Sequence, residues 1–156
     1  MVRYAEEKDL PQVNVIRRQV SELHVQGRPD IFKPGFCQEL QDHVYDLWRG
    51  ENSGVIVVER EGVICGMACV EYIDKPESPY NNPRKIYHIV EIGVDAAYRR
   101  QGVGRELMEF IKTDAGSRDC GSIELDMWSF NETAEKFYES IGFRTFRKFM
   151  EWKPEE

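Results

Sequence analysis

The chain has 156 residues and a formal net charge of −7, from 28 acidic and 21 basic side chains. This length suits one domain with its own core, and the negative charge disfavours a nucleic-acid-binding protein, which needs a basic face. No run approaches twenty apolar residues, so we expect no membrane helix, no signal peptide and a cytoplasmic single domain over residues 1–156.

The first half of the chain predicts a short strand followed by two helices. Residues 2–4 form the strand, and a helix opened by Pro11 lasts until Gly27. A second helix, over 36–49, ends before Gly50. Both helices carry apolar residues at helical spacing, so each is expected to bury one face.

The middle of the chain predicts a β-hairpin and a loop. Two strands, 55–58 and 63–72, are joined at 59–62 by a segment ending in Glu-Gly, which indicates a hairpin turn. Residues 74–84 hold three prolines and predict a loop. The final stretch, 144–152, has aromatic residues spaced as in a strand.

The most informative segment lies between an apolar strand at 86–94 and a helix that begins near residue 103. Gly102 and Gly104 would let a ligand approach bare backbone, and the first turn of a helix offers unpaired N–H groups and the positive end of its dipole. Formal positive charge comes from Arg99, Arg100 and Arg105. Such a loop suits a phosphate or pyrophosphate.

The glycine spacing excludes two common phosphate loops. It lacks the third glycine of a dinucleotide fingerprint, and neither glycine is followed by lysine as in a nucleoside-triphosphate loop. Instead, Arg99-x-x-Gly102-x-Gly104 resembles the loop that binds the pyrophosphate of coenzyme A in the GNAT superfamily of N-acetyltransferases. A second match follows: a strand at 122–128, then a helix that begins at Asn131 and ends at Gly142.

The resemblance implies an α/β (α+β) GNAT fold, with a mixed central sheet of about six to seven strands and helices on both faces. It also implies an enzyme that uses acetyl-CoA. The implied cofactor-binding residues are Ile92, Gly93, Val94, Arg99, Arg100, Gln101, Gly102, Val103, Gly104, Arg105, Asn131, Ala134, Phe137 and Tyr138. Asn131 could bond the cofactor, cap its own helix, or do both.

Acetyl transfer needs a proton to leave the amine and a proton to reach the departing thiolate. By resemblance, Tyr138 is the general acid, although an aromatic residue at this helix position could equally pack in the core. The base is left open between His88, Glu91 and an ordered water. In a regular strand His88 shares a face with Val90, Ile92 and Val94, and Glu91 lies on the opposite face; a bulge could redirect either.

The acceptor is expected over the first two helices and the proline-rich loop. Candidate substrate-binding residues are His24, Arg28, Asp30, Phe32 and Tyr80. Alternatively, the chain after the first helix forms only a turn, and Phe32 packs in the core. Acidic side chains in the region favour a cationic small-molecule amine. A protein N-terminal or lysine acetyltransferase and a non-catalytic acyl-CoA-binding module remain alternatives, and a homodimer is left open.

The cysteines and histidines give no metal-ligand pattern. Cys37, Cys65, Cys69 and Cys120 form no Cys-x-x-Cys pair, and only three histidines are scattered along the chain. We therefore expect reduced, mostly buried thiols and no metal.

Overall fold

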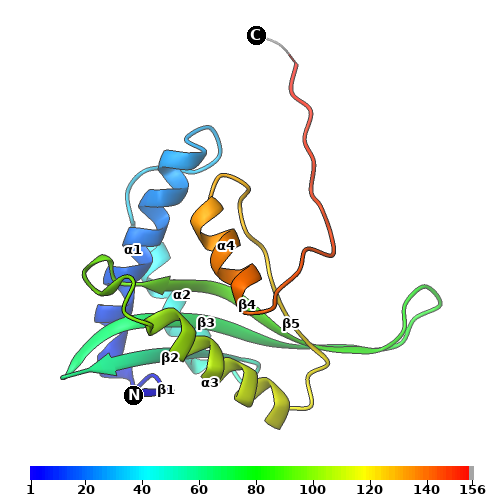
Figure 1. Cartoon of the computed structure of the whole chain (residues 1–156), viewed down its shortest axis with the longest axis horizontal. Helices are drawn as coiled ribbons and strands as arrows, with labels where there is room; N and C mark the ends of the chain where they lie inside the picture. Colours follow the sequence, from blue (N-terminus) through cyan, green and yellow to red (C-terminus); the bar gives the residue numbers. More distant parts are fainter. Residues whose placement is uncertain (155–156) are drawn as a thin grey trace. The chain divides into compact units, whose positions relative to one another are not determined.

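The structure is a computed structural model that describes residues 1–154. Its five strands form one sheet in the order β1-β2-β3-β4-β5 (Figure 1). The strands are β1 (Val2–Tyr4), β2 (Ser53–Arg60), β3 (Val63–Lys75), β4 (Arg84–Val94) and β5 (Ser122–Leu125). Neighbours are antiparallel except β4 and β5, which are parallel. The sheet is therefore mixed, as predicted.

The described residues also form four α-helices: α1 (Leu10–Gly27), α2 (Gln38–Arg49), α3 (Val103–Ser117) and α4 (Glu132–Ser140). The chain divides into two compact units, one up to Asp126 and the other from Met127 onward. The first unit holds the sheet with α1, α2 and α3, and the second holds α4. None of the helices in the described part of the chain is long and apolar enough to cross a membrane.

Helices cover both faces of the sheet, as predicted. The core against α1 and α2 contains Leu10, Val13, Ile16, Val44, Leu47, Val55, Val57, Ile64, Met67 and Cys69. On the opposite face, α3 packs so closely that a Cβ at Gly66 would lie 2.6 Å from Val103 Cγ1. Tyr87, also on this face, donates a hydrogen bond of 2.7 Å to Asp114 of α3. Alternation of side chains along each strand produces the two faces.

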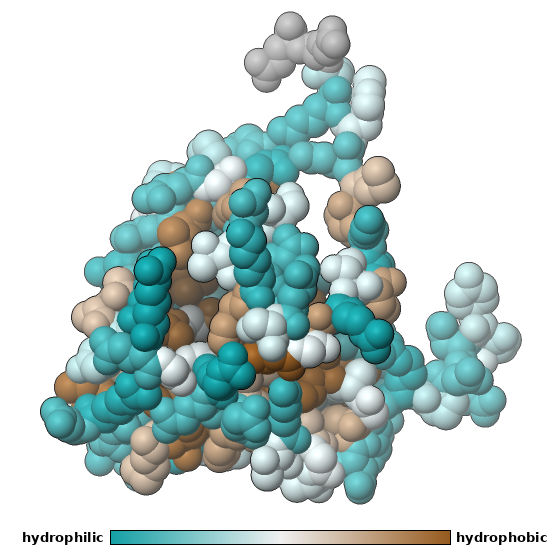
Figure 2. Space-filling model, in the orientation of Figure 1, coloured by the Kyte–Doolittle hydropathy of each residue, from teal (hydrophilic) through white to brown (hydrophobic). Residues whose placement is uncertain are grey.

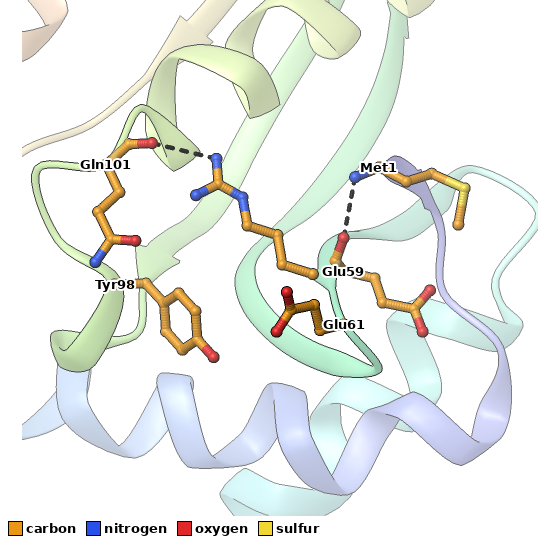
Figure 3. A pocket seen from close by; sticks show the side chains of 6 residues that line it. Met1, Glu59, Glu61, Tyr98 and Gln101 are labelled. Carbon is orange, nitrogen blue, oxygen red and sulfur yellow. Dashed lines mark hydrogen bonds between the residues drawn. The ribbon is translucent and has the colours of Figure 1, made fainter.

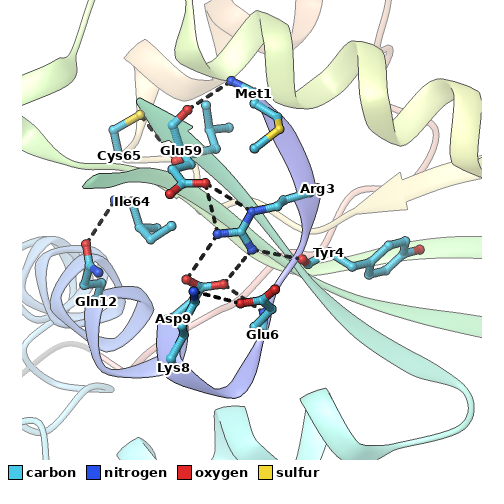
Figure 4. Close-up of polar contacts among 11 residues, drawn as sticks. Met1, Arg3, Tyr4, Glu6, Lys8, Asp9, Gln12, Glu59, Ile64 and Cys65 are labelled. Carbon is cyan, nitrogen blue, oxygen red and sulfur yellow. Dashed lines mark hydrogen bonds and ion pairs between the residues drawn. The ribbon is translucent and has the colours of Figure 1, made fainter. Parts of the chain in front are cut away.

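An ion-pair network attaches the short strand β1 to its surroundings (Figure 4). Arg3 binds Asp9 at 2.7 Å and Glu59 of β2 at 3.1 Å. The Arg3 hydrogen bond lowers the pKa of Asp9. β1 has only three residues, so its backbone hydrogen bonds are too few to hold it firmly. The charge-assisted bonds of Arg3 add to its attachment.

Two hairpins connect the central strands. The β2–β3 turn has Glu61 and Gly62 at φ 51° and 78°, the left-handed conformations that a two-residue hairpin requires. The β3–β4 hairpin is much longer and projects from the sheet (Figure 1). Its strands continue to Lys75 and restart at Arg84, so the predicted loop at 74–84 is shorter than expected.

The predicted sheet of six to seven strands was too large, since the described residues form five. The aromatic stretch at 144–152 is not a strand in the structure, and β5 ends at Leu125 although the pattern continued to residue 128. Alternating side chains make a segment able to form a strand, but a strand also needs a partner edge for its backbone groups.

Candidate active site

The loop between β4 and α3 has the backbone geometry of an anion-binding turn. Arg100 and Gly102 adopt φ of 62° and 81°, and a Cβ built at Gly102 would meet nothing within 4 Å. Gly102 is the N-cap of α3, so the free N–H groups of the first helical turn follow it directly. The loop is therefore open on the side where the helix dipole attracts negative charge.

Side chains around the loop hold it in place. Val103 is buried against the sheet, and Arg60 of β2 donates to the Gln101 carbonyl oxygen at 3.2 Å and to Glu106 Oε2 at 3.0 Å. The side chains of Arg99, Arg100 and Arg105 are exposed. An open glycine, a helix N-terminus and exposed guanidinium groups fit a pyrophosphate. The structure thus brings together the loop residues of the predicted cofactor-binding set.

A cavity of about 540 Å³ lies beside this loop (Figure 3). It is lined by Met1, Glu59, Arg60, Glu61, Tyr98 and Gln101. Only Gln101 belongs to the predicted site, and two carboxylates line the hollow. The cavity therefore borders the loop without including the expected acceptor residues.

The end of β4 has one paired edge and one open edge. Ile92, Gly93 and Val94 pair with β3 on one side. On the other side, β5 pairs only with residues 86–89 of β4. From Val90 to Val94 this edge has no strand partner among the described residues, so its backbone groups are available to an extended ligand.

A β-bulge in β4 changes which side chains share a face. Ile89 pairs with Val70 and Glu91 with Cys69, so Val90 is an extra residue. The bulge places Glu91 with His88 on the face covered by α1. Gly93 is on that face too, because its Cβ would lie 2.8 Å from Val20 of α1. The regular-strand parity was therefore wrong for Ile92 and Val94, which point to the α3 face.

Glu91 is held by a buried arginine that the sequence reading missed. Arg17 of α1, with a side chain only 2% exposed, donates from Nε to Glu91 Oε2 at 2.6 Å. It also donates to Asn14 Oδ1 at 2.8 Å and to the Leu40 carbonyl oxygen of α2 at 2.7 Å. One guanidinium thus ties together α1, α2 and β4. The available signal was its spacing: Arg17 lies four residues after Val13, on the apolar face of its helix.

His88 is the second candidate base. Its Nδ1 lies 3.9 Å from Glu71 Oε1 on the neighbouring strand, and its side chain is partly exposed. Because the bulge at Val90 turns Glu91 to the face of His88, both side chains can be reached from the same side of the sheet.

The helix break after α1 brings together four of the five predicted acceptor residues. His24 and Phe32 stack with ring centroids 5.1 Å apart, and burial lowers the pKa of His24. Arg28 donates twice to Asp30, both at 2.9 Å, so this carboxylate already has a cation beside it. Tyr80 is not part of the group: it is 93% exposed on the β3–β4 hairpin, because the strands extend and carry the loop outward.

The second unit carries the predicted acid. Asn131 Oδ1 accepts a hydrogen bond of 3.2 Å from Ala134 N, which confirms its capping role. Tyr138 packs edge-on against Phe137 and Phe143, with centroids 5.5 and 5.7 Å away. Burial raises the pKa of Tyr138 to about 12, so its hydroxyl is protonated at neutral pH.

A family comparison decides the class of the protein. The sequence model described as the acetyltransferase (GNAT) family matches residues 19–143. The chain belongs to this family. It is therefore an acyltransferase with acetyl-CoA as its cofactor, and the resemblance inferred from the two motifs is confirmed.

Solved structures support the same fold. The BH1408 protein of Bacillus halodurans, in a tetramutant form, is 31% identical, with a TM-score of 0.94 over 99% of both chains. The aminoglycoside acetyltransferase AAC(6')-Iy, bound to the bisubstrate analogue CoA-S-monomethyl-acetylneamine, has a TM-score of 0.77 at 15% identity. That match covers 99% of this chain and 97% of the other, and it shows the fold alone.

Curated relatives match over shorter segments. The ribosomal protein bS18-alanine N-acetyltransferase of Escherichia coli K12 is 36% identical over 55 residues, 35% of this chain and 37% of that protein. Across the curated relatives, the matches span 15% to 37% of their length.

Proposed function

We propose that this protein transfers the acetyl group of acetyl-CoA to the primary amine of a small molecule, with Tyr138 as the general acid. The observation that carries the proposal is the loop before α3, in which Gly102 is open and the helix N-terminus follows. Arg99, Arg100 and Arg105 would bind the pyrophosphate there. The open edge of β4 would pair with the pantetheine arm.

The acceptor amine must lose a proton, because a lysine-like amine has a pKa of about 10.4 in water. In the proposal, Arg17 holds the Glu91 carboxylate in one position, and this carboxylate accepts a hydrogen bond from the ammonium group of the acceptor. His88 then takes the proton directly or through a water. Asn14 and Leu40 orient Arg17 and so support Glu91 indirectly.

Attack of the amine on the thioester carbonyl would form the N–C bond and place negative charge on the carbonyl oxygen. When the carbonyl re-forms, the C–S bond would break and the charge would move to sulfur. A backbone N–H of residues 92–94 would stabilise the oxyanion. Tyr138 would protonate the departing sulfur. Burial raises the pKa of Tyr138 to about 12, so the hydroxyl keeps the proton that a general acid must donate over the whole neutral range.

A second candidate function is acetylation of a protein N-terminus. It is favoured by the 55-residue match to an enzyme that acetylates an N-terminal alanine. Both functions would share the same cofactor-binding loop and acid. They differ in whether the α1 face of β4 receives a compact amine or an extended peptide.

An acceptor panel tests the proposal. Thiol release from acetyl-CoA would be measured with a diamine, an amino sugar, a neutral monoamine and peptides starting with alanine or carrying lysine. Because Cys37 is exposed, each assay needs a blank without acceptor and product detection by mass spectrometry. We expect turnover with small cationic amines. Turnover with peptides alone would favour the second candidate, and coenzyme A binding without any turnover would indicate a binding module.

A further inference from the structure

The loop between β4 and α3 has a backbone conformation that its residues do not all favour. Arg100 has a φ of 62°, in the left-handed region where the side chain of an L-residue is crowded against the backbone. Gly102 has a φ of 81°, which glycine adopts without that cost. A loop with a strained residue keeps its shape only where contacts from the surrounding structure hold it.

One such contact comes from a distant strand. Arg60, the last residue of β2, donates from Nη2 to the Gln101 carbonyl oxygen at 3.2 Å (Figure 3). The backbone of Arg60 is fixed by its pairing with Val63 across the hairpin. The tip of the β2–β3 hairpin carries hydrophilic residues on the face seen in Figure 2. The hairpin therefore holds the loop through a polar contact.

This hydrogen bond determines where the next amide points. The Gln101–Gly102 peptide is trans, so the Gln101 C=O and the Gly102 N–H point in opposite directions. Because Arg60 holds the carbonyl oxygen, the Gly102 N–H is directed away from Arg60. No residue within 1–154 accepts a hydrogen bond from the N–H groups of residues 102–105. Successive N–H groups of this kind form a concavity that binds anions.

The same guanidinium group also binds the first turn of α3. Arg60 Nη2 lies 3.0 Å from Glu106 Oε2, and this hydrogen bond lowers the pKa of Glu106. Glu106 N in turn donates to the Gly102 carbonyl oxygen at 3.0 Å. Arg60 therefore contacts both the residue that precedes Gly102 and the residue whose N–H binds Gly102.

We propose that Arg60 is a positioning residue for coenzyme A: it orients the Gln101–Gly102 peptide so that the Gly102 N–H meets the pyrophosphate. The inference rests on the proposed binding of the pyrophosphate by this loop. Loss of Arg60 should weaken the binding of ligands that carry the pyrophosphate. Ligands with only the pantetheine arm should be unaffected, because that arm would bind along the open edge of β4.

Calorimetry with coenzyme A and with pantetheine, which lacks the pyrophosphate and the nucleotide, tests this selectivity. Arg60→Met keeps an apolar stem and removes the guanidinium group. We expect its affinity for coenzyme A to fall by about tenfold or more, as for the loss of one charge-assisted hydrogen bond. Its affinity for pantetheine should equal that of the wild type. Urea denaturation checks that the variant is folded.

The outcomes separate this proposal from the assignment of the loop. Unchanged coenzyme A affinity in Arg60→Met, or an equal loss for both ligands, would overturn the role of Arg60 alone. A wild type that binds pantetheine as tightly as coenzyme A would show that the loop does not bind the pyrophosphate, and the role of Arg60 would be wrong with it.

Glu106→Gln separates the peptide contact from the ion pair. It removes the carboxylate partner of Arg60 and leaves the Gln101 carbonyl oxygen in place, so coenzyme A affinity should not fall. A loss as large as in Arg60→Met would mean that the ion pair, and not the peptide, is what matters. ¹⁵N relaxation of the ligand-free protein gives a second readout. The Gly102 amide should become more mobile in Arg60→Met but not in Glu106→Gln, and unchanged mobility in Arg60→Met would contradict the proposal.

Discussion

The loop before α3 and the α1 face of β4 are built in different ways. The loop is made from consecutive residues, and its function depends on backbone conformation: Arg100 and Gly102 have positive φ and a helix follows. The α1 face depends on side chains far apart in sequence, since Arg17 and Glu91 are 74 residues apart. A site built from local backbone can be recognised in the sequence, whereas a site built from distant side chains requires the folded chain.

The largest expected effect lies outside both regions, at Tyr138. Tyr138→Phe keeps the ring packing with Phe137 and Phe143 and removes only the donor. Turnover should fall by roughly 10²–10⁴ while acetyl-CoA still binds. In the wild type, ionisation of Tyr138 should not reduce turnover until the pH approaches 12, because only the protonated form can donate. Steady-state kinetics from pH 6 to 11 check both points; unchanged turnover in Tyr138→Phe, with chemistry rate-limiting, would falsify the assignment.

Breaking the Arg17–Glu91 pair should lower the free energy of unfolding more than a substitution in the loop before α3. Arg17→Ala leaves Glu91 without its buried partner and should lower the free energy of unfolding by about 3 kcal/mol. The matched control is Arg18→Ala on the same helix, an exposed residue whose loss should cost less than about 1 kcal/mol. Urea denaturation of both variants gives the comparison. Equal losses would mean that the Arg17 pair contributes nothing beyond an ordinary surface arginine.

A substitution in the loop before α3 should lower the affinity for coenzyme A while leaving the stability of the fold nearly unchanged. Gly104→Glu places a carboxylate in the first turn of α3, where it would repel a pyrophosphate, so coenzyme A affinity should fall by about 100-fold, the range expected for loss of charged contacts. The helix itself should tolerate an acidic residue near its N-terminus. Gly104→Gln, of similar size, separates charge from bulk. Calorimetry on the folded variants measures the affinity, and an unchanged value for Gly104→Glu would remove the loop from the cofactor site.

The smallest effect concerns acceptor charge. Residues 10–49 contain Glu22, Asp30, Glu39, Asp42 and Asp46, but also five basic side chains, so the region is less acidic than its carboxylates alone suggest. Two of those basic residues are paired, Arg17 with Glu91 and Arg28 with Asp30. The exposed carboxylates on α2 should therefore give a diamine only a few-fold advantage in kcat/KM over a neutral-bodied monoamine.

That advantage should shrink as ionic strength rises, because salt screens exposed charges. Asp46→Asn should reduce it, and Glu77→Gln on the β3–β4 loop is the control that should not. Equal kcat/KM values for both amines at all salt concentrations would leave the acidic surface without a role in acceptor capture.

Several features could be predicted from the sequence because short-range rules determine them. Asn131 was expected to cap its helix and does so through Ala134 N. The β2–β3 hairpin followed from its Glu-Gly turn, since Gly62 needs a left-handed conformation. The family followed from two motifs with their flanking strands and helices.

Other features failed for reasons of tertiary structure. The sequence left two faces open for Glu91, and only the bulge at Val90 places it with His88. Tyr80 was grouped with Phe32 among the candidate substrate-binding residues, but it is exposed on the long β3–β4 hairpin. Residues 144–152 have a strand pattern without a strand, because pairing depends on an edge elsewhere.

The sequence by itself determined the helix and strand periodicities, the glycine loop and the family. These depend on neighbours within a few residues, where backbone sterics and hydrogen-bonding rules are strong. The tertiary structure alone decided that Arg17 holds Glu91, that His88 and Glu91 share a face, and that β4 keeps an open edge beside β5. Each of these depends on which distant segments pack together, and that choice is made by burial across the whole sheet.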